Sequence, residues 1–246
     1  MDHALLVIPV VTFFTAMLTG VVGMGGGLVL LLIMADFLPF AVLIPVHGIN
    51  QLVQHLTRAA VSIPNIDKRI SIQFGLGAII GAAIGSQFVM HVTEEIFKIV
   101  LGCFILGCLL YPKLNIKLPK IPGEWPFIGA FTSAVGLFIG NTGVFMSPFY
   151  LNRGLDKEQL VATKSACQVA VHSTKIIAFV MLGFTLGPYL LLVVLMAIAS
   201  FAGSYMSKKI LGKISEKVFL ILFQVTIVLL SLRLIIGGLN DAYHLW

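Results

Sequence analysis

A run of glycines interrupts the first apolar stretch of the chain. Four of the five residues from Gly23 to Gly27 are glycine, and the sequence around them is apolar from Ala4 to Phe37. Glycine is about 1 kcal/mol worse than alanine in a helix, so a helix over this stretch breaks here. Inside a bilayer, non-helical backbone is tolerated only where it is buried in protein or lines a cavity. The run therefore predicts the core of a binding site.

The composition is that of a polytopic membrane protein. Of the 246 residues, 59% are hydrophobic and only 11% are charged, whereas soluble domains carry about 25% charged residues. The net charge of +6 comes from lysines and arginines that fall mostly in short loops between apolar runs. Such a distribution reports membrane topology rather than a nucleic-acid surface. The three cysteines have no metal-ligand spacing. We predict neither a metal nor another cofactor.

The apolar runs form two similar series. Most are long enough for the about 20 residues that a membrane-spanning helix needs, but 27–37 and 143–152 cover only roughly half a bilayer. Each short run follows a break, the first at the glycine run and the second at Gly140-Asn141-Thr142-Gly143. The runs are 4–22, 27–37, 40–62, 70–91, 95–111, 125–140, 143–152, 158–181, 184–206 and 216–236.

The two series predict an internal duplication. Gly27 and Gly143 are 116 residues apart, and each opens a short helix. We therefore expect an all-α membrane protein whose first repeat is 1–111 and whose second is 125–246, joined by a proline- and lysine-rich linker, 112–124. At an offset of 117, the polar residues His47, Gln51, His55 and Arg58 correspond to Lys164, Gln168, His172 and Lys175.

The loop charges decide how the repeats are oriented. If each break were a loop between two full spans, the repeats would be parallel, and the basic loop residues would divide five against six between the two faces. If each break is the tip of a re-entrant hairpin followed by three transmembrane helices, the repeats are inverted and all eleven residues lie on one face. The positive-inside rule favours the inverted arrangement, which is a recurring plan of transporters. It places both termini outside and the linker in the cytoplasm. The eleven residues are Lys68, Arg69, Lys113, Lys117, Lys120, Arg153, Lys157, Lys208, Lys209, Lys213 and Lys217.

Four polar residues share one face of the helix predicted over 40–62, and four more share a face over 158–181. Both sets have spacings of 4, 4 and 3 residues, which place them on one side of a helix. Polar groups inside a bilayer are expensive unless they face a cavity or one another. The two columns contain cations, amides and imidazoles but no Asp or Glu, so the predicted cavity suits an anion.

The two breaks are expected to have a positive electrostatic potential, as the polar columns do. Each half-helix begins at its break, so free N–H groups and the positive end of the helix dipole point toward the middle of the membrane. In the second copy, Asn141 and Thr142 can cap the half-helix or donate to a ligand. We expect Arg58, Lys164 and Lys175 to attract the anion and to act in gating. The predicted binding residues are Gly25, Gly26, Gly27, Gln51, His55, Asn141, Thr142, Gly143, Gln168 and His172.

These features resemble the sulfite exporter TauE/SafE family of membrane permeases. The resemblance rests on Gly20-Val21-Val22-Gly23-Met24-Gly25-Gly26-Gly27-Leu28-Val29, on the duplication, and on Gly143-Val144-Phe145-Met146-Ser147-Pro148-Phe149 with its proline. It implies transport of sulfite, sulfoacetate or related organosulfonates across a bacterial inner membrane. The chain departs from the family pattern in two places. The first unit has Leu31 and Leu32 in place of the proline, and the second has Asn141-Thr142 where a glycine pair is common.

We therefore expect a transporter, acting in export, that alternates access around an anion held between the two half-helices. Gln51 and Gln168 would bond the anion directly, while His55 and His172 would add donors and a pH response. An anion channel of the same fold is the first alternative. An intramembrane enzyme that uses His47, His55 and His172 as metal ligands or bases is the second, and a scaffold for another membrane complex is the third.

Overall fold

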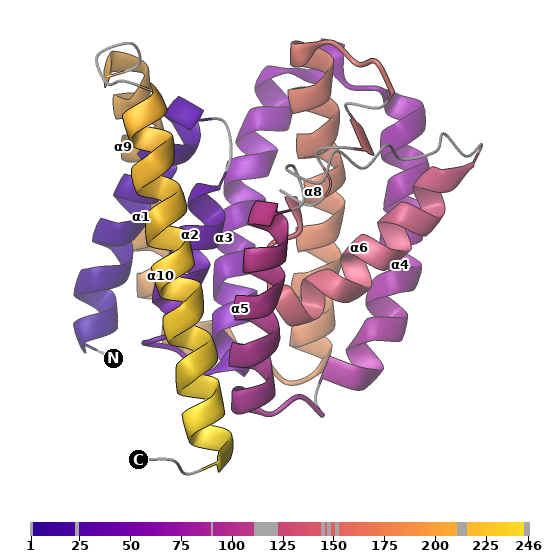
Figure 1. Ribbon diagram of the computed structural model, residues 1–246. Coiled ribbons are helices and arrows are strands. Elements are labelled where there is room, and N and C mark those ends of the chain that lie inside the picture. The colour runs from indigo at the N-terminus through magenta and orange to yellow at the C-terminus, as the bar shows by residue number, and fades with distance from the viewer. Residues whose placement is uncertain are drawn as a thin grey trace. The chain divides into compact units, whose positions relative to one another are not determined.

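The computed structural model describes residues 2–22, 25–89, 91–110, 123–143, 146, 149–150, 153–210 and 216–243. Over these residues the chain is all-helical, with 88% of them in helices and none in strands (Figure 1). Most of the predicted linker, several of the basic loop residues, Gly23, Met24 and part of the predicted half-helix 143–152 lie outside the described residues. The helices are α1 Asp2–Val22, α2 Gly26–Met34, α3 Phe40–Val61, α4 Lys68–Val89, α5 Glu94–Leu110, α6 Glu124–Ile139, α8 Lys157–Met181, α9 Leu190–Ile210 and α10 Glu216–Tyr243, with 3-10 turns η1 Ile63–Asn65 and η3 Gly187–Tyr189.

Several helices have the length and composition of membrane spans. In the described part of the chain, three segments are long and apolar enough to cross a bilayer: Lys68–Val89, Gly187–Ser207 and Gln224–Tyr243. His3–Thr19 and Glu124–Ile139 are shorter apolar helices. Large apolar side chains also point outward, with Phe88 61% and Phe201 74% exposed. A surface of this kind suits lipid rather than water, which supports a multi-pass membrane protein.

The helices form two compact units, and each unit draws helices from both predicted repeats. Unit 1 consists of Met1–His47, Val92–Asn115 and Leu186–Trp246. Unit 2 consists of Gly48–His91 and Ile116–Thr185. Helix α3 begins in unit 1 and continues into unit 2.

In unit 2, α4 lies against both α6 and α8. Small residues allow the backbones of α4 and α6 to approach closely. A Cβ added at Gly77 would overlap the carbonyl of Pro126, and a Cβ at Gly129 would overlap the carbonyl of Phe74. Glycine is therefore required at these crossings by space rather than by backbone conformation.

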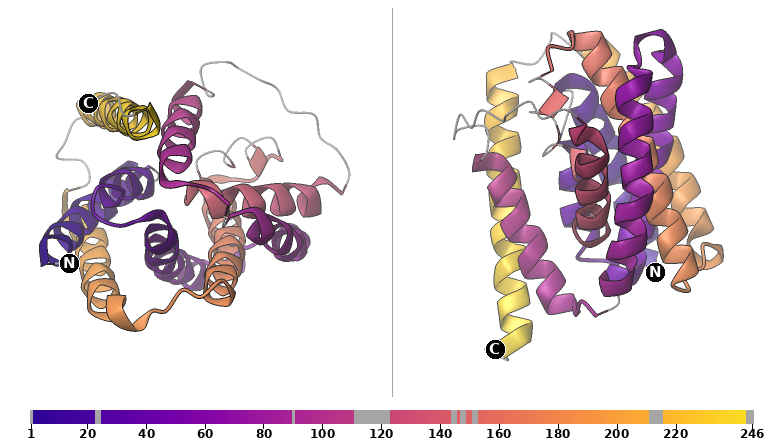
Figure 2. Two further views of the ribbon diagram at one scale, coloured as in Figure 1. Left: turned by 90° about the horizontal axis from the view of Figure 1, so that it is seen from below. Right: turned by 90° about the vertical axis from the view of Figure 1, so that its right-hand side faces the viewer.

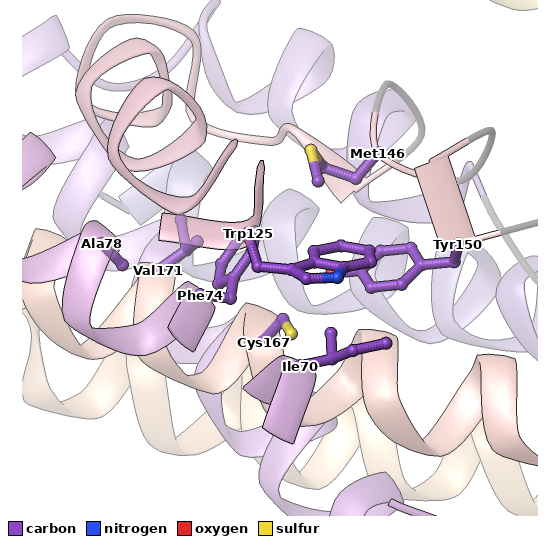
Figure 3. Packing of buried hydrophobic residues seen from close by; sticks show 8 residues of the cluster. All are labelled: Ile70, Phe74, Ala78, Trp125, Met146, Tyr150, Cys167 and Val171. Atoms are coloured by element: carbon purple, nitrogen blue, oxygen red, sulfur yellow. The ribbon is translucent and has the colours of Figure 1, made fainter. Parts of the chain in front are cut away.

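A hydrophobic cluster joins these helices in unit 2 (Figure 3). At its centre the rings of Trp125 and Tyr150 stack with their centroids 5.2 Å apart. Tyr150 is fully buried, and Phe74 from α4 lies in the same cluster. The stack joins the start of α6 to a residue that comes after the second break. The eight buried residues are Ile70, Phe74, Ala78, Trp125, Met146, Tyr150, Cys167 and Val171.

In unit 1, α1 lies against α9, and α5 lies against α10 (Figure 2). Gly203 of α9 packs on the carbonyl of Phe13, with no room for a Cβ. Gly238 of α10 packs on α5, where an added Cβ would lie 2.9 Å from the carbonyl oxygen of Glu95. These contacts repeat in unit 1 the type of glycine crossing seen between α4 and α6.

Polar bonds join helix ends at one end of unit 1. The backbone N–H of Phe40 donates to Oε1 of Glu94 over 2.7 Å, so α5 supplies a cap for the first turn of α3. Lys98 pairs with Asp241 at 2.6 Å. Arg233 pairs with Asp36 at 3.0 Å. Together these bonds place the end of α10 beside the starts of α3 and α5.

Candidate functional site

The chain folds back on itself in unit 2 around Gly140–Gly143. At the open end of this hairpin, Arg153 Nε donates to Glu124 Oε1 over 2.9 Å. Next to that pair lies the stack of Trp125 on Tyr150. Closer to the tip, the hydroxyl of Thr132 donates to Sδ of Met146 over 2.9 Å. From the open end toward the tip, the residues of each contacting pair are separated by fewer positions in the sequence. The second break is therefore the turn of a hairpin.

The tip is held by two different side chains. Gly140 ends α6 with a φ of 78°, a left-handed conformation that favours glycine. Its carbonyl accepts a hydrogen bond from the ammonium of Lys175 on α8. The N–H of Gly143 donates to Oδ1 of Asn141 over 3.0 Å. Asn141 therefore caps the backbone after the break, which is one of the two roles expected for it.

The polar column of α8 runs past this tip. A Cβ added at Gly143 would lie 3.8 Å from Cδ of Gln168 and 3.8 Å from Cε of Lys164. His172 and Lys175 are each only 1% exposed, and Gln168 is fully buried. Nζ of Lys175 also lies 3.5 Å from Nδ1 of His172. The spacing of 4, 4 and 3 residues thus places the predicted column of α8 along one hairpin tip.

Two buried polar groups at the tip have no hydrogen-bond partner among the described residues. They are the side-chain amide of Gln168, at both its nitrogen and its oxygen, and the hydroxyl of Thr142, which is 2% exposed. Buried polar groups are nearly always paired, and each exception needs an explanation. An amide that is buried without partners is the pattern expected of a group that bonds a ligand.

Helix α3 meets the polar column of α8 at two levels. His55 stacks on His172 with ring centroids 5.6 Å apart and an angle of 13° between the rings. The side chain of Lys175 lies beside Gly48, where an added Cβ would be 3.3 Å from Cδ of Lys175. Gln51 is 4% exposed, and Arg58 lies in the last turn of α3.

At the first break, in unit 1, backbone hydrogen bonds and close packing hold the chain in place. Gly25 precedes α2 with a φ of 94°, and its carbonyl accepts from Leu28 N over 2.9 Å. A Cβ on Gly26 would overlap the carbonyl of Thr15 in α1, so α2 begins alongside α1. Nε2 of His47 lies 2.9 Å from the carbonyl oxygen of Gly27 and donates to it.

The residues that make room for Lys175 were not predicted from the sequence. Besides Gly48, an added Cβ on Gly136 would lie 3.9 Å from Cε of Lys175. The two glycines thus border the stem of a buried lysine. The signal was present in the sequence, because each glycine interrupts a helix without ending it, and an isolated glycine inside a helix often has a packing reason.

One protein family matches nearly the whole chain. The family model described as "Sulfite exporter TauE/SafE" matches residues 8–234, which is most of the chain. The chain belongs to the sulfite exporter TauE/SafE family. Neither the comparison with curated proteins nor that with solved structures gives a match.

Membership of the TauE/SafE family implies a membrane transporter of sulfur anions. It confirms the family resemblance read from the glycine motif and the duplication. The match includes both breaks and both polar columns, since it runs from α1 into α10. In this TauE/SafE chain, Leu31 and Leu32 are buried within α2. Pro148 of the second unit lies outside the described residues.

Proposed function

We propose that this TauE/SafE protein moves a small sulfur oxyanion or organosulfonate across a bacterial inner membrane, in the direction of export. We further propose that the anion binds at the hairpin tip of unit 2. One observation supports this location of the anion site. The amide of Gln168 is fully buried and lacks a partner among the described residues, and both this amide and the stem of Lys164 lie beside Gly143.

The groups at the tip have separate roles in this proposal. Lys164 supplies positive charge, while Gln168 and Thr142 supply hydrogen-bond donors. Lys175 holds the tip through the carbonyl of Gly140. His55 and His172 form a stacked wall next to it. No Asp or Glu is found among the buried polar residues of the described part of the chain, so the lysine charges at the tip meet no buried carboxylate.

The arrangement of helices supports the inverted repeats that we propose. Under the sequence offset, α1 corresponds to α6 and α4 corresponds to α9. In unit 2, α4 lies against α6, and in unit 1 the corresponding α9 lies against α1. The chain also turns back after the first helix of each repeat, at Gly25–Gly27 and at Gly140–Gly143. Repeats of this kind alternate access by rocking about a fixed site.

Two residues of the proposed basic face lie together within unit 2. Arg69 and Arg153 line one cavity of 310 Å³ with Asp67 and Trp125 at the open end of the hairpin. We propose that this end faces the cytoplasm, with both termini on the opposite side. A membrane potential of 100 mV, negative inside, favours anion export by about 2.3 kcal/mol per charge. Export thus needs no coupling ion in this scheme.

Flux of radiolabelled sulfite into proteoliposomes tests the proposal. We expect saturable flux with trans-stimulation, and at least about a 10-fold loss in Gln168→Ala because a buried site loses its donor. Gln224→Ala is the matched control, since Gln224 is exposed on α10. If Gln168→Ala transports as well as the parent, the tip is not the binding site. Flux that does not saturate and shows no trans-stimulation would instead identify an anion channel.

A further inference from the structure

The side-chain amide of Gln168 is unusual because both of its polar atoms lack partners. Neither Nε2 nor Oε1 makes a hydrogen bond within the described part of the chain, although the side chain is fully buried. The two atoms have opposite requirements. The nitrogen needs an acceptor, which any sulfur oxyanion supplies, while the oxygen needs a donor. An anion that has no hydrogen-bond donor can bond the nitrogen of this amide but not its oxygen.

Neighbouring side chains do not supply the missing donor. The hydroxyl of Thr142 is itself buried without a partner, so it is not bonded to Gln168. The ammonium of Lys175 is directed to the carbonyl of Gly140. The N–H of Gly143 is taken by Asn141. Oε1 of Gln168 is therefore available to accept a hydrogen bond from a ligand at the tip.

We propose that the site selects an anion that carries its own hydrogen-bond donor next to the sulfur oxyanion group. Hydrogen sulfite and short hydroxyalkanesulfonates have this chemistry, whereas donor-free alkanesulfonates do not. The physical basis is that a buried polar group left unpaired costs free energy. A site built to bond an OH or NH group rejects analogues that lack it far more strongly than it rejects a change in apolar size. This inference rests on the proposed binding of anions at the hairpin tip.

A matched pair of ligands tests the selection. 2-Hydroxyethanesulfonate and ethanesulfonate share charge and sulfonate group and differ by one hydroxyl. Each is used to compete with radiolabelled sulfite in proteoliposomes that contain the full chain. We expect 2-hydroxyethanesulfonate to compete at least about 10-fold better. Equal competition by the two ligands, with saturable sulfite flux intact, overturns the selection but leaves the proposed transport standing. No saturable sulfite flux at all would instead count against the proposed function.

Two variants assign the selection to Gln168. Gln168→Met keeps the size of the side chain and removes both hydrogen-bonding atoms, so the preference should fall to about 1-fold. Gln168→Asn keeps the amide and withdraws it by one methylene, so it should retain part of the preference and serves where the methionine variant does not fold. Gln224→Met, on the exposed face of α10, should leave the ratio unchanged. A full preference that persists in both Gln168 variants would overturn the assignment.

Discussion

The two breaks in this chain solve one physical problem with different chemistry. At the first, the backbone turns through glycines, Gly26 packs directly on α1, and His47 bonds the carbonyl of Gly27. At the second, side chains hold the turn, with Asn141 on the N–H of Gly143 and Lys175 on the carbonyl of Gly140. The first break thus combines close packing with one histidine bond, and the second is held by two polar side chains.

The two breaks also differ in the space beside their described glycines. A Cβ at Gly26 would overlap backbone, whereas a Cβ at Gly143 would approach nothing closer than 3.4 Å, and two of its neighbours are side chains of the polar column. Substitutions at each break test this difference through their effects on stability and flux.

The largest effect is expected from glycine substitution at the first break. Gly26→Ala places a methyl group against the carbonyl of Thr15, which should destabilise the protein by about 3 kcal/mol. Gly143→Ala should fold nearly as well as the parent and lose sulfite flux, because the methyl group points at Gln168 and Lys164. Thermal unfolding in detergent measures the first effect and proteoliposome flux the second. Gly107→Ala, with open space around it, is the control. Equal unfolding temperatures for Gly26→Ala and Gly143→Ala would remove the contrast.

The next effect concerns the lysine at the second tip. Lys175→Met removes the ammonium that bonds Gly140 and leaves the carbonyl without that donor, at a cost of about 2 kcal/mol. Lys164→Met should change the unfolding temperature less and reduce flux more, since we assign Lys164 to the anion. Thermal unfolding and flux are compared for the two variants. A larger loss of stability in Lys164→Met would reverse the two roles.

The smallest effect is expected at the cap. Asn141→Ala removes the acceptor for Gly143 N and should cost about 1 kcal/mol. Asn141→Asp keeps the acceptor and should restore stability, but its negative charge should weaken anion flux. Since Gly25 has no side-chain cap at the first break, no single cap variant can have this effect there. Unchanged stability in Asn141→Ala would show that the cap contributes nothing.

Much of the helical pattern could be predicted from the sequence, and the failures have local causes. Helix α10 continues past the predicted end at 236 to Tyr243, because Gly238 packs on α5 and Asp241 pairs with Lys98. Helix α9 begins at Leu190 rather than at 184. Gly183, with a φ of 98°, and the 3-10 turn at Gly187–Tyr189 occupy the start of that apolar run.

Side-chain partners from distant segments could not be predicted from local patterns. Lys98 and Arg233 have the sequence context of single charges near helix ends, yet both are ion-paired, with Asp241 and Asp36. Glu94 suits the first turn of its own helix, yet it caps α3. The polar columns were predictable because they share a helix face. The bond from Lys175 to Gly140 depends on how a hairpin and a helix pack.

In unit 1, helices from the start of the chain pair with helices from its end, and this has a consequence for biosynthesis. Helix α1 is the first described element of the chain, but its partner α9 begins at Leu190. The partner of α5 is α10, which likewise comes much later in the chain and begins at Glu216. Contacts so distant in sequence form slowly, because a long loop must close before they are made. During synthesis, α1 and α5 must therefore remain in the lipid with the faces that later contact α9 and α10 uncovered until the last part of the chain has been inserted.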